Sequence, residues 1–213
     1  MNLPSMIDIP IEYITQIKDD FYNSPTYTTN GMKKVVSIKK LKSVNTLVEY
    51  LGFDINCMVG DNYYKHTRSY FPHVDAPADD CKKYLHIVIP LEKEYDDTQH
   101  FIIFDQYSKI GPATWTGLLD VDIDFETNIQ VKGNIREQDI TNFIKSGISD
   151  EFAKKYLPYP KEWYNGLSAT AYEWTPGKGI MFPSNRLHAS GNMPRDMYKL
   201  GITFKFKLPN DVY

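Results

Sequence analysis

The chain has 213 residues, of which 42% are hydrophobic and 14% aromatic, enough for the core of one domain with or without a sizeable insertion. The formal net charge is -3 and the charges are dispersed, so no block of like charge indicates a nucleic-acid-binding tail or a membrane patch. The start of the chain does not resemble a signal peptide and no apolar stretch approaches the roughly 20 residues that span a bilayer, so we expect a soluble, cytoplasmic protein without a membrane partner.

The first quarter of the sequence predicts helices beside short strands. Apolar residues at helical spacing indicate helices over residues 10–23 and 43–51, the second ended by Gly52. Apolar runs over residues 33–40 and 55–59 indicate two short strands.

From residue 62 onward the pattern is that of β-strands. Residues 62–71 are aromatic and extended, and two strongly apolar runs follow at residues 84–91 and 99–106. Charged, turn-forming residues separate these two runs, at positions 92–98. The spacing therefore predicts that the two runs form a hairpin.

Residues 108–166 are less regular and predict an insertion between β elements. Within it, residues 138–152 look partly helical. We expect this insertion at the mouth of a site, as a pocket wall or lid. The β pattern then resumes in three runs, residues 168–174, 179–182 and 198–207. Residues 1–213 thus predict a single, mainly β domain with flanking α elements.

A candidate metal site is formed by His73, Asp75 and His188. Residues two apart on an extended segment point to the same side, so His73 and Asp75 can reach one ion, and a second imidazole from a distant strand completes the set. Two His and one carboxylate on one face, with open positions opposite, is the arrangement of non-heme Fe(II) oxygenases. Taken alone, each residue has a structural alternative: His73 can cap a turn beside Pro72, and His188 can be an ordinary buried histidine.

A distinctive run of residues surrounds His188. A Pro176–Gly177 turn leads into a short apolar strand, Phe182–Pro183 and then His188, and Lys199 follows eleven residues later. This run resembles the 2-oxoglutarate/Fe(II)-dependent dioxygenases, in particular the prolyl-hydroxylase-like members, and Lys199 is similar to the basic residue of the family's last core strand. The resemblance covers residues 60–107 and 168–207.

This resemblance implies a double-stranded β-helix, a cupin-like jelly roll, with N-terminal helices. It implies Fe(II) held by His73, Asp75 and His188, with 2-oxoglutarate and O2 as cosubstrates and ascorbate as a supporting reductant. Lys199 would pair with the distal carboxylate of 2-oxoglutarate, and Thr203, on the same strand face, would support it.

Other residues are weighed beside this set. Tyr63 and Tyr70 resemble tyrosines that contact cosubstrate or substrate in relatives, although strand aromatics are ordinarily core residues. Arg195 is a rival to Lys199 for the carboxylate. His86 either lines the barrel near the metal or is a core histidine.

The implied function is hydroxylation of an unactivated C–H bond in a peptide or small molecule, with release of succinate and CO2. The carboxylate of Asp75 favours hydroxylation, because halogenating relatives lack it. The alternatives are a cupin-type metal enzyme that does not use 2-oxoglutarate, and a non-catalytic jelly-roll binding or virion protein. The primary substrate and the oligomeric state stay open at this point.

Overall fold

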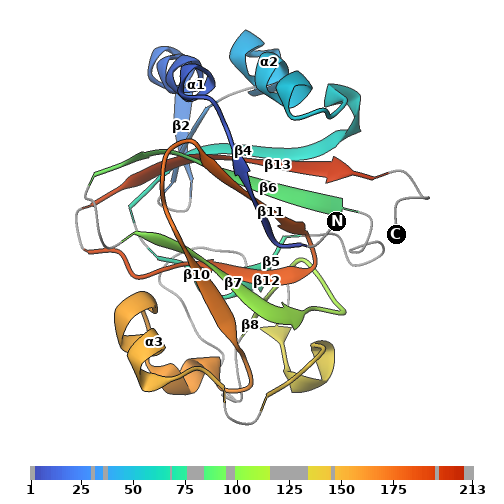
Figure 1. The fold of residues 1–213 in the computed structure, drawn as a ribbon, viewed down its shortest axis with the longest axis vertical. Helices are drawn as coiled ribbons and strands as arrows, with labels where there is room; N and C mark the ends of the chain where they lie inside the picture. The colour runs from blue at the N-terminus through green and yellow to red at the C-terminus, as the bar shows by residue number, and fades with distance from the viewer. Residues whose placement is uncertain are drawn as a thin grey trace.

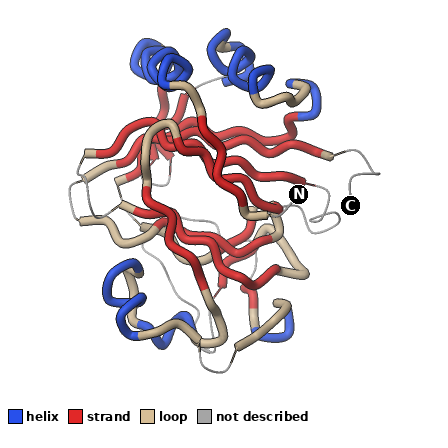
Figure 2. The backbone as a smooth tube through the Cα atoms, in the orientation of Figure 1, coloured by secondary structure: helices blue, strands red, loops and turns tan. Residues whose placement is uncertain are grey.

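The computed structural model describes residues 3–29, 32–35, 38–67, 69–75, 84–94, 99–115, 134–144, 147–194 and 197–208, without the side chains of residues 29, 32, 33 and 134. Two β-sheets face each other, and helices cover their outer faces (Figures 1 and 2). None of the helices in these ranges has the length and hydropathy that a bilayer-spanning helix requires.

The larger sheet has seven strands in the order β1-β11-β6-β13-β4-β3-β2, and neighbouring strands in it are antiparallel. Their bounds are β1 Ser5–Asp8, β2 Thr26–Thr29, β3 Met32–Val35, β4 Met58–His66, β6 Tyr84–Lys93, β11 Lys178–Pro183 and β13 Lys199–Lys207. Strand β13 lies at the centre and pairs with β4 on one side and β6 on the other.

The smaller sheet has six strands in the order β10-β7-β12-β5-β8-β9. Their bounds are β5 His73–Val74, β7 His100–Tyr107, β8 Ala113–Trp115, β9 Asn134–Ile135, β10 Ala169–Glu173 and β12 Arg186–Ser190. Figure 1 shows this sheet facing the larger one, with β7 and β12 at its centre. From β4 to β7, and again from β10 to β13, successive strands alternate between the sheets, as in the double-stranded β-helix that the resemblance implied.

Two apolar cores lie on the outer faces of the sandwich. Helices α1 (Ile11–Asn23) and α2 (Lys42–Tyr50) cover the larger sheet, and Ile14, Ile17 and Phe21 of α1 are buried there at helical spacing. Helix α3 (Asp150–Tyr156) and the 3-10 turn Lys161–Tyr164 cover the smaller sheet. Other 3-10 turns are Ile38–Lys40, Ile55–Cys57 and Glu137–Asp139.

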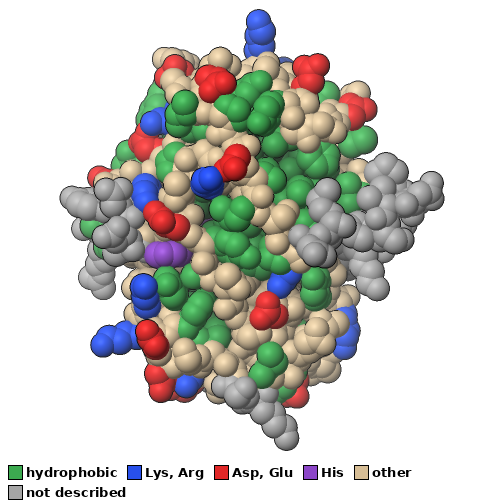
Figure 3. All heavy atoms as spheres, viewed as in Figure 1, with side chains coloured by type: hydrophobic (Ala, Val, Ile, Leu, Met, Phe, Trp, Pro, Cys, Tyr) green, Lys and Arg blue, Asp and Glu red, His purple; other side chains and the backbone are tan. Residues whose placement is uncertain are grey.

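A smaller third cluster lies between the sheets. It contains Tyr64, Val88, Phe101, Ile103, Trp174, Ile180 and Phe182. This interior is only partly apolar, because buried histidines and Lys199 share it. On the face of the molecule shown in Figure 3, basic and acidic side chains are interspersed, in keeping with the small net charge.

The predicted N-terminal helices and the core strands are confirmed within a few residues. The predicted hairpin is wrong, because the apolar runs 84–91 and 99–106 form β6 and β7, which lie in opposite sheets. The predicted strands over residues 33–40 and 55–59 are correct only in part, because Ile38–Lys40 and Ile55–Cys57 form 3-10 turns. The partly helical character of residues 138–152 is confirmed: helix α3 begins at Asp150, where the Ser149 side chain accepts a hydrogen bond from the Phe152 amide and caps it.

Candidate active site

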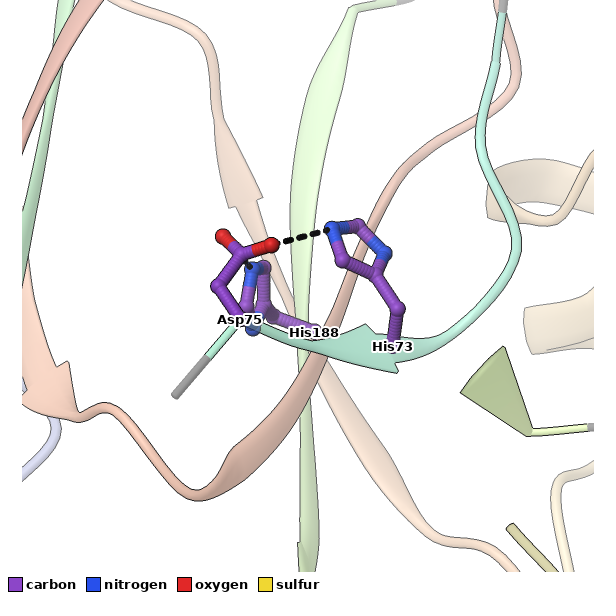
Figure 4. A group of neighbouring side chains, drawn as sticks. All are labelled: His73, Asp75 and His188. Carbon is purple, nitrogen blue, oxygen red and sulfur yellow. Dashed lines mark ion pairs between the residues drawn. The ribbon is translucent and has the colours of Figure 1, made fainter. Parts of the chain in front are cut away.

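His73, Asp75 and His188 come together at the inner face of the smaller sheet. His73 lies directly opposite His188 in the antiparallel pairing of β5 with β12, so the sheet register brings the two imidazoles together. Asp75 follows β5 immediately. Figure 4 shows the three side chains pointing toward one another. One ligand atom from each lies within 4.8 Å of the others, a group that can hold a metal ion.

The orientation of both imidazoles leaves one ring nitrogen of each free for an ion. His73 Nδ1 lies 2.7 Å from the carbonyl oxygen of Phe71, and His188 Nδ1 lies 3.1 Å from that of Arg186. A carbonyl oxygen can only accept a hydrogen bond, so Nδ1 carries the proton and Nε2 carries the lone pair. The two Nε2 atoms lie 3.8 and 3.6 Å from the Asp75 carboxylate oxygens. This donor set fits a divalent metal.

The protonation states of these groups suit metal binding. Burial, reinforced by the neighbouring His188, lowers the pKa of His73 to about 4, so its ring is neutral at physiological pH. Burial raises the pKa of Asp75, but the ammonium of Lys205 and the two imidazoles outweigh that effect and hold it well below its usual range. The site therefore offers the neutral imidazole of His73 and the carboxylate of Asp75 without first losing a proton.

A cavity of about 110 Å³ extends from these residues between the sheets. It is lined by Asn62, Tyr64, His66, Tyr70, His73, Asp75, His86, Val88, Phe101, Trp174, His188, Ala189, Ser190, Lys199 and Thr203. The candidate metal ligands, Lys199, Thr203 and Tyr70 all lie on it, so the structure brings together all but one of the residues that the sequence predicted for the site.

Lys199 is buried in this cavity. Its side chain is 2% exposed, and its Nζ donates to the carbonyl oxygen of His100 at 3.3 Å and lies 4.5 Å from the centre of the Trp174 ring. Among the described residues no acidic group pairs with it. Burial alone lowers its pKa to about 7. A buried ammonium of this kind is costly unless an anion joins it.

Alternate residues of β13 form one wall of the cavity. Lys199, Gly201 and Thr203 point inward, while Leu200, Ile202 and Phe204 pack in the outer core. A Cβ atom on Gly201 would lie 2.6 Å from the Trp174 ring, so only glycine leaves room for the tryptophan at this position.

Tyr63 does not line the cavity, contrary to prediction. Its ring packs in the outer core, 4.8 Å from that of Phe21 on helix α1. Tyr64, the next residue, faces the cavity instead. Both tyrosines are buried because both faces of β4 are covered, so side-chain polarity did not distinguish the faces. Tyr70 lies as expected, with its ring centre 6.5 Å from that of His73.

His86 lines the cavity, which decides between the two positions that the sequence allowed for it, near the metal or in the core. Its ring centre lies 5.2 Å from that of His188, and among the described residues neither ring nitrogen has a hydrogen-bond partner. Burial lowers its pKa well below the usual range, so it is neutral. Two further polar groups near the site were missed, Asn62 and Lys205. Strand alternation from Thr203 would have found Lys205.

Two other expectations concern regions that the structure describes only in part. Arg195, the rival of Lys199, lies outside the described residues. The described parts of the 108–166 segment do not reach the cavity. They extend the smaller sheet with β8 and β9 and build its outer core with α3. These parts do not line the cavity, although Thr114 of β8 lies opposite His73, so the expected role as a lid or pocket wall stays a prediction.

Comparisons with known proteins support the fold. No family model and no curated protein sequence matches the chain. Among solved structures, the chain is similar to a prolyl-4-hydroxylase of Pseudomonas putida, with a TM-score of 0.52 and 9% identity over 97% of this chain and 92% of that one. It is also similar to HygX of Streptomyces hygroscopicus with nickel and 2-oxoglutarate bound, with a TM-score of 0.50 and 9% identity over 97% and 84%. At this level of identity the likeness shows a shared fold.

Proposed function

We propose that this protein is an Fe(II)- and 2-oxoglutarate-dependent dioxygenase that hydroxylates an unactivated C–H bond of a small-molecule or peptide substrate. Bound together, Fe(II), 2-oxoglutarate and O2 supply the oxidant, as 2-oxoglutarate loses CO2 to give succinate and one oxygen atom enters the substrate. The observation that carries the proposal is Lys199, which is buried in the same cavity as His73, Asp75 and His188 and pairs with no carboxylate of the described residues.

Each side chain has a defined task in this proposal. His73, Asp75 and His188 hold the metal on one face, which leaves its opposite positions for other ligands. The ammonium of Lys199 pairs with the distal carboxylate of 2-oxoglutarate, a charge-assisted contact strengthened by burial. The Thr203 hydroxyl, two positions beyond Gly201 on the same face of β13, supports that carboxylate. We assign Tyr64, and not Tyr63, as the β4 tyrosine facing the cosubstrate, and Tyr70 lines the same cavity.

Lys199 also separates the proposal from its two alternatives. A cupin-type metal enzyme that does not use 2-oxoglutarate, or a non-catalytic binding protein, has no need of an unpaired ammonium at this depth. Burying the ammonium of Lys199 lowers the free energy of unfolding. A role in binding an anion accounts for a charge at this position. No particular observation favours either alternative.

The test measures binding and turnover separately. We expect the wild-type protein to bind Ni(II) and then 2-oxoglutarate in calorimetric titrations, and to form succinate from 2-oxoglutarate with Fe(II), O2 and ascorbate. His73→Ala and Asp75→Ala should abolish metal binding. Lys199→Ala should keep the metal but weaken 2-oxoglutarate binding about 10-fold or more, as expected for a buried charge-assisted contact.

Lys207→Ala is the matched control, because Lys207 is an exposed lysine on the same strand. It should bind 2-oxoglutarate like the wild type. If the wild-type protein bound neither metal nor 2-oxoglutarate, the proposal would be overturned. An unchanged affinity in Lys199→Ala would transfer the role to Arg195.

A further inference from the structure

A second, larger cavity adjoins the candidate active site. Its volume is about 450 Å³, and Asn62 lines both cavities. We call it the lysine recess. It is lined by Tyr27, Lys34, Val35, Ile38, Lys39, Lys40, Asp61, Asn62 and Tyr63. No role in the oxygenase chemistry proposed above uses these residues.

The recess reaches the inner face of the larger sheet through Lys34. Lys34 lies opposite Tyr64 in the pairing of β3 with β4, so the two side chains share the face on which the cavity lies. The Lys34 Nζ donates a hydrogen bond to Asn62 Oδ1 at 2.9 Å. The negative charge of Asp75 acts on the Lys34 ammonium and favours its protonated form. The recess and the candidate metal site are therefore neighbours along β4.

The recess carries an excess of positive charge. Three of its lining residues are lysines and one, Asp61, is acidic. In the described part of the chain none of the three lysines forms an ion pair: Lys34 donates to a neutral amide, and Lys39 to the carbonyl oxygen of Met58 at 2.6 Å. Burial lowers the pKa of Lys34, and the nearby carboxylates of Asp75 and Asp61 offset this effect only in part.

Lys205 adds a further charge between the recess and the metal site. Its Nζ lies 3.5 Å from Asp75 Oδ2 and 3.2 Å from the Asp75 carbonyl oxygen. Gly60 lies opposite it on β4, and the Lys205 side chain occupies the space that a Cβ there would need, at 3.3 Å. The chain thus directs a long cationic side chain toward the metal ligands.

The charges near the metal do not balance in the loaded site. Asp61 and Asp75 contribute two negative charges, Lys34, Lys199 and Lys205 contribute three positive ones, and the two carboxylates of 2-oxoglutarate cancel a divalent metal. About one positive charge remains at neutral pH when all three lysines are protonated. It lies on the side that Lys34 and Lys205 occupy, because Lys199 serves the cosubstrate, and Lys39 and Lys40 of the recess add to it. Such a site favours an anion.

We propose that the lysine recess binds an anionic group, a carboxylate or a phosphate, of a small-molecule primary substrate, and that Lys34 and Lys40 are its specificity-determining residues. The substrate would extend past Asn62, with its reacting carbon toward the metal. The inference rests on the proposed function in naming this ligand a substrate, but the anion site itself can be tested without turnover.

The experiment uses two probes, phenyl phosphate and benzoate, titrated calorimetrically into the full-length protein. We expect at least one probe to bind the wild type, and Lys34→Gln to weaken that binding about 10-fold. Lys40→Gln, at an exposed position where folding is not at risk, should weaken it less but measurably. Lys154→Gln, an exposed lysine on helix α3, is the control and should bind like the wild type.

The outcomes separate the two anion sources and the two proposals. Preference for phenyl phosphate would identify a phosphorylated substrate, and preference for benzoate a carboxylic acid. No binding by the wild type, or equal binding by all variants, would overturn the recess as an anion site. Failure of the wild type to bind 2-oxoglutarate would overturn the proposed function and leave the result on the recess standing.

Discussion

Lys199 and Asp75 illustrate two opposite consequences of burying a charge. Asp75 is surrounded by a cation and two imidazoles, so its carboxylate stays ionised. Lys199 is surrounded by an indole ring and a carbonyl oxygen, so its charge is poorly compensated and its pKa falls to about 7. The first arrangement is ready for a cation and the second for an anion, which is what binding a metal and an acidic cosubstrate together requires.

The lowered pKa of Lys199 predicts a pH-dependent affinity for 2-oxoglutarate. The ammonium is present below about pH 7 and is lost as the pH rises through the pKa of the ligand-free protein. Since the anion binds the charged form, affinity should fall about tenfold for each pH unit above that value. Titration of the Ni(II)-loaded protein across this range measures it. Lys199→Arg should remove the dependence, because arginine stays charged. A flat wild-type profile would contradict the prediction.

The same shift affects stability with the opposite sign. The folded pKa lies below the unfolded one, so between about pH 7 and pH 10 the unfolded chain binds more protons at this residue. The contribution of Lys199 to the free energy of unfolding is therefore least favourable below about pH 7 and improves as the pH rises. A bound anion should offset the cost at neutral pH.

At the scale of single elements, β13 carries the site. Its inward residues line the cavity, and its outward residues belong to the outer core, while β4 and β6 hold it on both sides. A one-residue shift in register would exchange these two sets of side chains. The strand must therefore keep its register for both folding and binding.

Gly201→Ala tests how closely β13 fits the cavity wall. The added methyl group would meet two carbons of the Trp174 ring at 2.6 and 2.7 Å, so the ring must move, and Lys199 packs over that ring. We expect a loss of about 1 to 3 kcal/mol in the free energy of unfolding. Weaker 2-oxoglutarate binding should accompany it. Adding Trp174→Phe, a smaller ring, should recover part of the stability. Wild-type stability in Gly201→Ala would refute the close fit.

How far the sequence predicts these elements depends on whether a strand has one buried face or two. The last strand was located from its apolar run, and His73 and His188 from their spacing and context. The choice between Tyr63 and Tyr64 failed because both faces of β4 are buried. The prediction that β6 and β7 form a hairpin was wrong for a related reason. An apolar run predicts a buried strand but does not indicate to which of two sheets the strand belongs. The lysine recess joins β2, β3 and β4 with a 3-10 turn, a neighbourhood set by tertiary packing.

At the scale of the whole molecule, stability and binding draw on different regions. The two larger apolar clusters lie outside the sandwich, under α1 and α2 and under α3. The space between the sheets holds the smaller cluster together with the polar cavity. Most of the apolar burial that stabilises the fold is thus separate from the candidate site.

Phe21→Ala should show this separation. Phe21 is 1% exposed beneath α1, and truncating such a residue costs about 3 to 5 kcal/mol. We expect a clearly lower melting temperature, yet an undiminished rise in that temperature when Ni(II) and 2-oxoglutarate are added. Ile11→Ala, an exposed position on the same helix, should leave the melting temperature nearly unchanged. Loss of the ligand-induced rise in folded Phe21→Ala would show that the outer core and the site are coupled.

The placement of the two larger cores has a consequence for how such proteins diversify. Inward side chains of β3, β4 and β13 can be exchanged while the outer clusters, and hence the fold, are preserved. In proteins that share this fold, residues that contact ligands can therefore be substituted while the fold is kept. This accords with structural neighbours that keep the architecture at 9% identity. In this chain, Lys34 of β3 and Lys205 of β13 are such inward side chains.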